Sequence, residues 1–357
     1  LLTVLMGNPN FLILDEPTAV LTPQETEELF AVIRKIVKEK GMTVIIITHK
    51  LYEVMEISDR VGVMRQGRLV SVNETKNMDE RKLASMMVGR EVLFDHIEKT
   101  GKTGKILVDV KNLCVSDSRG IPAVRNLSLA VHAGEIVGIA AIEGNGQSQL
   151  AEAIMGMCRT DSGEIFINGE TICGKSPGQI RQIGAAHIPE DRIATGVSTQ
   201  STITENLVVG KERRPEFASR GIHLKKPSIT RYAEELFEKF DMRGSGIDTP
   251  AGSLSGGNMQ KVVVAREFSF DTPVLVISQP TRGVDIGAME FIHQQIIRKR
   301  NEGCAILLIS ADLDEIFRLS DRIVTMYEGK ITGDFKTGEI DKMSVGYYMT
   351  GNRGGTA

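Results

Sequence analysis

The chain has 357 residues, which suits two domains, or one complete domain with part of another, better than a single ordinary domain. Hydrophobic residues make up 41% and charged residues 25% of it, and this composition excludes a disordered, collagen-like or disulfide-stapled protein. The net charge of −3 gives no global attraction to nucleic acid, and the four scattered cysteines lack CxxC spacing, which suits reduced thiols in a reducing compartment.

The opening of the chain reads as alternating strands and helices. It begins at Leu1 instead of Met and soon enters a buried strand, so we expect an amino-terminally truncated sequence. The apolar run 11–14 predicts a strand covered on both faces. A capping Thr22-Pro23-Gln24-Glu25 segment predicts a helix that ends at Gly41. A second strand over 43–48 and a helix over 51–57 complete a pattern typical of a parallel α/β sheet.

The chain contains an internal duplication. Residues 11–70 return in modified form at 274–332, and the dipeptide Ser58-Asp59 with its following arginine recurs at 320–322. The second repeat has an opening stretch of roughly 150 residues that the first lacks, so we expect one complete repeat and one remnant. The expected organisation is a carboxyl-terminal remnant at 1–93, a short polar linker at 94–104, a complete unit at 105–350 and a tail at 351–357.

The complete repeat opens with strands and then a glycine-rich turn. Strands over 106–115 and 127–131 alternate as antiparallel strands do, and a buried strand over 136–140 leads into a helix over 148–156. Further on, a basic insertion at 211–230 precedes a helix at 231–240. A solvated face explains this insertion more simply than a contact with a partner does, and both interpretations stay open.

The turn at 141–148 is a candidate phosphate-binding loop. It lies between a buried strand and a helix, where backbone N–H groups and the helix dipole can bind phosphate oxygens. Against the pattern G-x-x-x-x-G-K-[ST], Ala141 replaces the first glycine and Gln147 replaces the lysine. The loop is therefore degenerate, and a plain turn between strand and helix remains the alternative. The candidate binding residues are Gly144, Asn145, Gly146, Gln147 and Ser148.

Three residues of the first repeat form a candidate hydrolytic set. Asp15 and Glu16 at a strand end could organise Mg²⁺ and deprotonate an attacking water, as transfer of a phosphoryl group from a nucleotide requires. His49, at the end of the next strand, could contact the γ-phosphate or the water. The equivalent residues of the second repeat are Ser278, Gln279 and Ala311. These replacements delete the charge and the base, so we expect the second repeat to keep its fold without hydrolytic groups.

The run 254–266 (LSGGNMQKVVVAR) places Ser255, Gly256 and Gly257 at a helix start, where bare N–H groups can bind an anion. The run is similar to the signature motif of ATP-binding cassette (ABC) ATPases. Its Asn and its Gln-Lys-Val-Val segment, which includes Gln260, resemble the branch with two fused cassettes that powers simple-sugar and nucleoside importers. Residues 12–18 resemble the Walker B motif, 48–49 the switch-histidine segment and 281–285 the D-loop region. Residues 187–192 (HIPEDR) resemble the segment this branch carries in place of the Q-loop, with Glu190 at the Gln position.

The resemblance implies a fold, ligands and roles. The fold is an α/β P-loop NTPase-like cassette: a mainly parallel sheet with flanking helices, an antiparallel β subdomain and a helical subdomain in the complete repeat. The ligands are ATP and Mg²⁺, with Asp15 on the metal and Glu16 and His49 as catalytic residues. Cassettes of this family pair head to tail, within a full-length chain or between chains. The intact signature of the second repeat would then complete a working site with Glu16, and the opposite site would bind nucleotide without turnover.

The resemblance also implies a function. We expect an ATP-hydrolysing subunit that energises an importer of nucleosides or simple sugars at the cytoplasmic face of the plasma membrane. No apolar run reaches the roughly 20 residues of a spanning helix, so integral-membrane permease subunits and an extracytoplasmic solute-binding protein would be separate partners. We expect no nucleic-acid partner. Because the first repeat lacks its phosphate loop, we expect this chain alone to hydrolyse ATP negligibly.

Two alternatives differ in class. A soluble twin-cassette ATPase that acts on ribosomes would share these motifs, but such proteins carry a long charged linker and residues 94–104 are few. A nucleotide-binding regulatory module without hydrolysis would suit Gln147, Ser278 and Gln279. The transported solute is not determined by these motifs, although the run 143–148 is closer to nucleoside importers than to ribose or galactoside importers.

Overall fold

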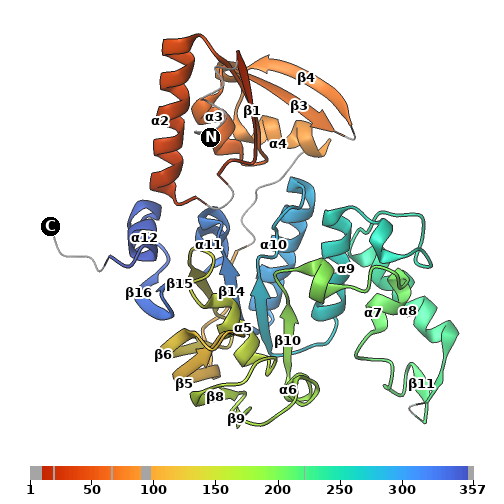
Figure 1. The fold of residues 1–357 in the computed structure, drawn as a ribbon. Coiled ribbons are helices and arrows are strands. Elements are labelled where there is room, and N and C mark those ends of the chain that lie inside the picture. Colours follow the sequence, from red (N-terminus) through yellow and green to blue (C-terminus); the bar gives the residue numbers. More distant parts are fainter. Residues whose placement is uncertain (1–9, 19–20, 66, 90–97, 221, 353–357) are drawn as a thin grey trace.

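The computed structural model describes residues 10–18, 21–65, 67–89, 98–220 and 222–352, which form two lobes (Figure 1). The first lobe comprises residues 10–89 and is drawn in red and orange above the second lobe, residues 98–352. The start of the chain at 1–9, the expected domain boundary at 93–94 and the tail residues 353–357 lie outside the described residues.

The first lobe is a small α/β unit. Its β1 and β2 pair in parallel, and β3 and β4 form an antiparallel hairpin. The elements are β1 (Phe11–Asp15), α2 (Pro23–Lys40), β2 (Thr43–Ile47), α3 (Leu51–Ile57), β3 (Arg60–Arg65), β4 (Arg68–Glu74), a single 3-10 turn (Thr75–Asn77) and α4 (Glu80–Val88).

The caps of α2 confirm the prediction from its sequence. The Glu25 backbone N–H donates to the Thr22 hydroxyl at 3.3 Å, and the Thr22 N–H donates to the Glu25 carboxylate at 2.8 Å. Pro23 occupies the first turn, where its missing N–H removes no helical hydrogen bond. Gly41 ends the helix with a φ of 63°, a left-handed conformation that favours glycine.

The prediction that the first strand is covered on both faces is wrong for the described residues. Leu12 is buried, whereas Phe11 is 60% and Ile13 is 54% exposed. Successive side chains of a strand point to opposite faces, so one face of β1 packs on the lobe and the other faces outward.

The second lobe contains three sheets. A six-stranded sheet has the order β10-β13-β14-β7-β15-β16, a four-stranded antiparallel sheet has the order β6-β5-β8-β9, and β11 pairs with β12. Its strands are β5 (Ile106–Ser116), β6 (Pro122–His132), β7 (Ile136–Ala140), β8 (Ser162–Ile167), β9 (Glu170–Thr171), β10 (Ala185–Ile188), β11 (Ala218–Ser219), β12 (His223–Leu224), β13 (Val274–Ser278), β14 (Ala305–Ser310), β15 (Arg322–Tyr327) and β16 (Lys330–Lys336).

Helices pack beside the six-stranded sheet, and α7, α8 and α9 form a helical region to one side of it (Figure 1). The helices are α5 (Gln147–Ile154), α6 (Pro177–Ile183), α7 (Ile203–Val208), α8 (Lys226–Lys239), α9 (Gly256–Phe268), α10 (Ile286–Asn301), α11 (Leu313–Leu319) and α12 (Lys342–Met349), with short turns at Arg192–Gly196 and Ala251–Ser253. None of the helices in the described part of the chain combines the length and apolarity needed to cross a bilayer.

The predicted fold class is confirmed for the second lobe. Its large sheet is parallel except at the β15–β16 edge, as the α/β pattern predicts. Alternate strand residues feed two separate cores: Val276 and Leu307 pack on one face, whereas Ile277 and Leu308 pack on the other. A strand buried on both faces is continuously apolar, which is why these runs show no alternation.

The duplication extends to the three-dimensional structure. Seven elements of the first lobe recur in the same order in the second: β1, α2, β2, α3, β3, β4 and α4 correspond to β13, α10, β14, α11, β15, β16 and α12. Local details recur as well. Glu16 and Gln279 follow the equivalent strands with φ angles of 44° and 47°, and Thr18–Glu53 and Thr281–Glu315 are equivalent buried hydrogen bonds.

The basic insertion at 211–230 is not wholly a solvated face, because one of its lysines is buried. Lys211 is only 2% exposed, and its ammonium donates to the Tyr232 hydroxyl at 2.6 Å and to the Ser269 carbonyl at 2.5 Å. Burial, together with the charge of Arg214, lowers the pKa of Lys211 to about 7. Helix α8 also starts earlier than predicted, because Pro227 suits a first turn.

Candidate functional site

A cavity of about 1180 Å³ lies between the two lobes. The first lobe contributes Glu16, His49 and Lys50, and the second lobe contributes the ends of its parallel strands and the turn after β7. In an open parallel sheet the carboxyl ends of the strands are the usual place for a ligand site. The polar residues of the second lobe that line this cavity include Glu143, Ser148, His187, Glu190, Ser278, Gln279, Arg282 and Asp312.

The turn after β7 is tightly fixed. Gly144 and Gly146 have φ angles of 90° and 97°, and a Cβ on Gly146 would lie 2.0 Å from the Ala123 carbonyl oxygen. The Asn145 amide donates to the Ile142 carbonyl at 3.0 Å, and its oxygen accepts from the Glu328 N–H at 2.7 Å. The turn therefore needs glycine at these positions, and the hairpin between β15 and β16 holds it in place.

Gln147 stands where a phosphate loop carries lysine, and its side chain turns away from the cavity's polar groups. It is 4% exposed, and its amide nitrogen donates back to the Ile142 carbonyl at 3.2 Å. Its amide oxygen is buried and has no hydrogen-bond partner among the described residues. The turn thus contributes no cation of its own at this position.

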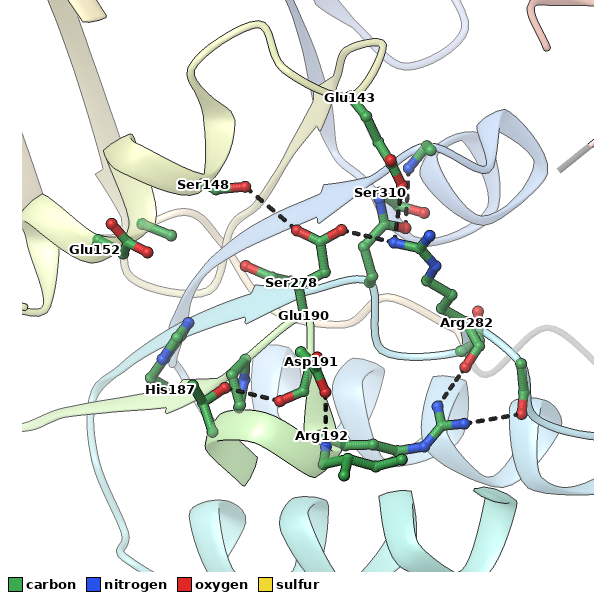
Figure 2. A pocket seen from close by; sticks show the side chains of 18 of the residues that line it. Glu143, Ser148, Glu152, His187, Glu190, Asp191, Arg192, Ser278, Arg282 and Ser310 are labelled. Carbon is green, nitrogen blue, oxygen red and sulfur yellow. Dashed lines mark hydrogen bonds and ion pairs between the residues drawn. The ribbon is translucent and has the colours of Figure 1, made fainter. Parts of the chain in front are cut away.

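A cation does reach the turn from another segment, Arg282, which follows β13. Figure 2 shows its guanidinium between two carboxylates, with Nη1 at 2.8 Å from Glu143 and 2.8 Å from Glu190. The Ser148 hydroxyl donates to the other oxygen of Glu190 at 3.2 Å. Arg192 fixes the segment by donating to the carbonyl of Arg282. Arg282 was not among the site residues predicted from the sequence, and its place in the D-loop-like run 281–285 was the one signal that pointed to it.

The structure brings Glu16 and His49 together. His49 Nδ1 lies 2.9 Å from a Glu16 carboxylate oxygen, and both side chains are partly exposed to the cavity. In the second lobe Gln279 takes the place of Glu16, and its side-chain oxygen accepts from the Ala311 N–H at 3.2 Å. The shape of the pair is thus preserved while the carboxylate and the imidazole are lost. Asp15 ends β1, and it is not among the described residues that line the cavity.

The run 254–266 forms a capped helix start. Ser255 caps α9, and its hydroxyl accepts from the Asn258 amide at 3.0 Å. A Cβ on Gly256 would lie 2.8 Å from the Arg192 guanidinium, so this glycine allows a close approach. Gly257 is buried beside Asp285 in the same way.

The start of α9 does not line the cavity between the lobes. Ser255, Gly256 and Gly257 are not among the described residues that line the cavity beside Glu16. Gln260 is 2% exposed and lies inside the lobe, where its amide nitrogen has no partner among the described residues. The predicted pairing of Glu16 with the Ser255–Gly257 segment therefore stays a prediction.

His187, which lines the cavity, should make the free energy of unfolding depend on pH. Burial lowers the pKa of His187 to about 4; the charge of Glu267 raises it and that of Arg181 lowers it. In the unfolded chain the imidazole of His187 takes up a proton near pH 6.5, whereas in the folded chain this side chain stays neutral down to about pH 4. Lowering the pH through this window therefore favours the unfolded state. We expect His187 to account for a loss of about 2 kcal/mol between pH 6.5 and 5.

Urea unfolding at pH 5 and pH 7 checks this expectation. His187→Leu should flatten the dependence, and the exposed His223→Gln should leave it unchanged. An equally steep dependence in His187→Leu would assign the acid sensitivity to other groups.

Comparison with known proteins places this geometry in a family. The ABC transporter family matches residues 124–282. The nucleoside import ATP-binding protein NupA of Lactococcus lactis subsp. cremoris (strain MG1363) is 41% identical over 98% of this chain and 69% of its own length. The guanosine import ATP-binding protein NupO of Bacillus subtilis (strain 168) is 42% identical over 99% of this chain and 69% of its own length.

A solved nucleotide-free ATP-binding cassette from an ABC transporter superposes with a TM-score of 0.56 at 22% identity, covering 67% of this chain and 94% of its own. At that identity the likeness shows the fold alone. The sequence relatives show the family as well, because they are 41% and 42% identical to this chain and the chain spans about two thirds of their length. The chain belongs to the ATP-binding cassette family of ABC transporter proteins.

Proposed function

We propose that this chain is the greater part of an ATP-hydrolysing subunit that energises an ABC importer of nucleosides or simple sugars. The two relatives above are named for nucleoside and guanosine import, and others are named for import of glucose, ribose and xylose. The similarity of the run 143–148 to nucleoside importers favours a nucleoside.

We further propose that the first lobe is the carboxyl-terminal part of a first cassette, fused to a second cassette at about residue 105. The observation that supports this most is a difference between equivalent residues. Phe11, Ile13, Ile45 and Ile47 are between 49% and 60% exposed. Their second-lobe equivalents are almost fully buried: Val274, Val276, Leu307 and Ile309.

Those equivalents are buried in the core that also contains β5, β6, β7 and α5. An apolar sheet face of this kind is costly to leave in water, at roughly 25 cal/mol for each Å². A segment like 106–188 would cover the equivalent face of the first lobe. Its phosphate loop would then complete the site at Glu16.

The donor set of the cavity fits Mg²⁺ and ATP. Among the described residues no cluster of three or more His, Cys, Asp or Glu side chains is arranged to hold a metal ion. Mg²⁺ in nucleotide sites needs only one or two protein oxygens besides the phosphates and waters. Asp15 offers such an oxygen in the first lobe, and Ser148 and Glu190 offer two in the second. When bound, the ion would neutralise phosphate charge.

The roles that we propose for this chain's own residues follow from their chemistry. Glu16 would accept the proton of the attacking water, and His49 would orient Glu16 and contact the γ-phosphate. The Ser255–Gly257 segment would bind phosphate through its N–H groups from across the pair of cassettes. In the second lobe, residues Gly144–Ser148 with Glu190 would hold a nucleotide. Gln279 cannot act as a base there, so we propose binding without turnover.

The proposed partners are integral-membrane permease subunits and, through them, an extracytoplasmic solute-binding protein. The chain would work at the cytoplasmic face of the membrane, and its two cassettes would pair within the full-length chain. A ribosome-bound role is less well supported, because the relatives are named for import.

Phosphate release by the purified chain tests the proposed division of labour. We expect the chain to bind a fluorescent ATP analogue through its second lobe and to release phosphate at the background rate, since Gln279 offers no base and the first lobe has no phosphate loop in this sequence. Extending the chain at its amino end by the part that would complete the first cassette, and adding permease and solute-binding protein, should give solute-stimulated hydrolysis. Robust Mg²⁺-dependent phosphate release from the 357-residue chain alone would contradict the proposal.

A further inference from the structure

The lobes contact each other through a reciprocal pair of helix contacts. Helix α4 of the first lobe packs on α10 of the second, and α12 of the second lobe packs on α2 of the first. Because α2 corresponds to α10 and α4 corresponds to α12, each contact is the counterpart of the other. An interface with this property follows a two-fold axis, here an approximate one between repeats.

The same reciprocity holds residue by residue. Ala84 packs against Ile286 in one contact. In the other, the Gln24 amide donates to the Met343 carbonyl at 2.9 Å, and a Cβ on Gly346 would lie 2.7 Å from the Gln24 side-chain oxygen. Ala84 and Gly346 are each the fifth residue of their helix, α4 and α12. Ile286 opens α10 as Pro23 opens α2, and a Cβ on Gly346 would also lie 3.2 Å from Pro23 Cδ. The two contacts are therefore made by equivalent pairs.

Close to a two-fold axis, a residue faces its own equivalent. Lys50 immediately precedes α3, and Asp312, 262 residues later, immediately precedes α11. Both side chains line the cavity between the lobes described above. Tyr52 and Asp314 form a second equivalent pair at the same interval of 262 residues, and the charge of Asp314 acts on Tyr52. The starts of α3 and α11 therefore approach one another across the axis.

The electrostatics of these helix starts agree with that placement. Burial raises the pKa of Asp312, the charges of Glu315 and Asp314 raise it further, and the charge of Lys50 opposes them. Burial also raises the pKa of Tyr52, as do the charges of Glu53, Asp314 and Asp312. The first lobe thus presents a cation where the second presents a carboxylate.

Each of these charges also has neighbours in its own lobe. The Lys50 ammonium donates to the Thr18 carbonyl at 3.2 Å and lies 3.6 Å from Glu53. Asp312 caps α11 by accepting from the Asp314 N–H at 2.8 Å. A test of the contact across the axis has to separate it from these local bonds.

We propose that the opposite charges of Lys50 and Asp312 select pairing between unlike lobes over pairing between like lobes. Two first lobes on the same axis would set Lys50 against Lys50, and two second lobes would set Asp312 against Asp312. Specificity of this kind comes from repulsion in the wrong pair as much as from attraction in the right one. The proposal concerns how the repeats pair and does not depend on nucleotide hydrolysis.

A disulfide between the lobes can report how often they are paired. Gln24→Cys with Gly346→Cys in the full chain places the two thiols at the reciprocal contact, and the first change also removes the side-chain amide that would lie nearest a Cβ at position 346. The rate of disulfide formation with a fixed oxidant measures the paired population, and peptide mapping separates this bond from the four native cysteines. Light scattering confirms that the bond forms within one chain.

Single and double substitutions in this reporter chain test the proposal. Lys50→Met keeps the aliphatic stem, and Asp312→Asn keeps an oxygen that can cap α11. We expect each to slow disulfide formation about fivefold, and the double variant to be no slower than either, because coupled groups are not additive. Lys50→Asp should slow it most, and Lys50→Asp with Asp312→Lys should recover part of the loss. Lys76→Met, which removes an exposed charge from the same lobe, serves as the matched control.

Additive losses in the double variant would assign both effects to the local bonds and overturn the proposal. Unchanged rates in both single variants would overturn it as well. If Lys50→Met does not fold, Asp312→Asn carries the test through salt: the rate in the parent chain should fall between 0.05 M and 1 M salt and that of Asp312→Asn should not, because salt screens the pair. Equal salt dependence in the two would contradict the proposal.

Discussion

Replacing Glu16 by glutamine should lower ATP turnover about 10³-fold in a protein in which an amino-terminal extension completes the first cassette of this chain, since a positioned general base contributes about 10²–10⁴-fold. Glutamine keeps the shape of the side chain and its contact with His49, which lies 2.9 Å from the carboxylate, but cannot accept the proton of water. Steady-state phosphate release at saturating Mg²⁺ and ATP measures the effect, and nucleotide affinity should change little.

The second lobe offers the matched control. Gln279 is the equivalent of Glu16 and already lacks the carboxylate, so Gln279→Asn should change turnover less than about threefold. A large loss in Gln279→Asn, or an active Glu16→Gln protein, would show that the base lies elsewhere.

Replacing Glu315 by alanine should destabilise the second lobe by about 3 kcal/mol, because it breaks a buried polar cluster. The Glu315 carboxylate accepts from the Thr281 hydroxyl at 2.8 Å and lies 2.8 Å from His293 Nε2. All three side chains are less than 10% exposed, so alanine would leave two buried polar groups without their partner. Urea unfolding, followed by a probe in the second lobe, measures the change.

An exposed carboxylate just after the end of α10 provides the comparison. Glu302 pairs with Arg298 and Lys299 at the surface, so Glu302→Ala should change the free energy of unfolding by less than about 1 kcal/mol. Equal effects in the two variants would contradict a structural role for the buried cluster. The equivalent cluster of the first lobe, Thr18 with Glu53, predicts a similar sensitivity there.

Local rules predicted much of the fold. The capping box at Thr22, the stop at Gly41 and the apolar strands over 43–48 and 136–140 depend on neighbours in sequence, and the structure has them. The duplication was also predictable, because equivalent residues recur at a nearly constant spacing: Glu16 and Gln279 are 263 residues apart, and His49 and Ala311 are 262 apart. The exposure of Phe11 and Ile13 was not, because burial on the second face of a strand depends on what covers it.

The candidate site was only partly predictable for the same reason. The pairing of Glu16 with His49 follows from two adjacent parallel strands, and the turn at Gly144–Gly146 follows from its glycines. The contact of Arg282 with Glu143 and Glu190 joins segments more than 90 residues apart. No periodicity or motif reports such a contact, so the cation beside the degenerate loop had to be found in the structure.

The segment just before β5 has a further consequence. Lys99 donates to the Ser320 carbonyl at 2.7 Å, the Thr100 N–H donates to the Asn301 side chain at 3.0 Å, and Gly104 bonds to Ala133. This stretch is thus anchored to the base of the second lobe instead of swinging freely. A short anchored tether keeps its two ends at a high effective concentration. Cut ahead of Glu98, the same two lobes would have to find each other by diffusion, and their association would depend on dilution.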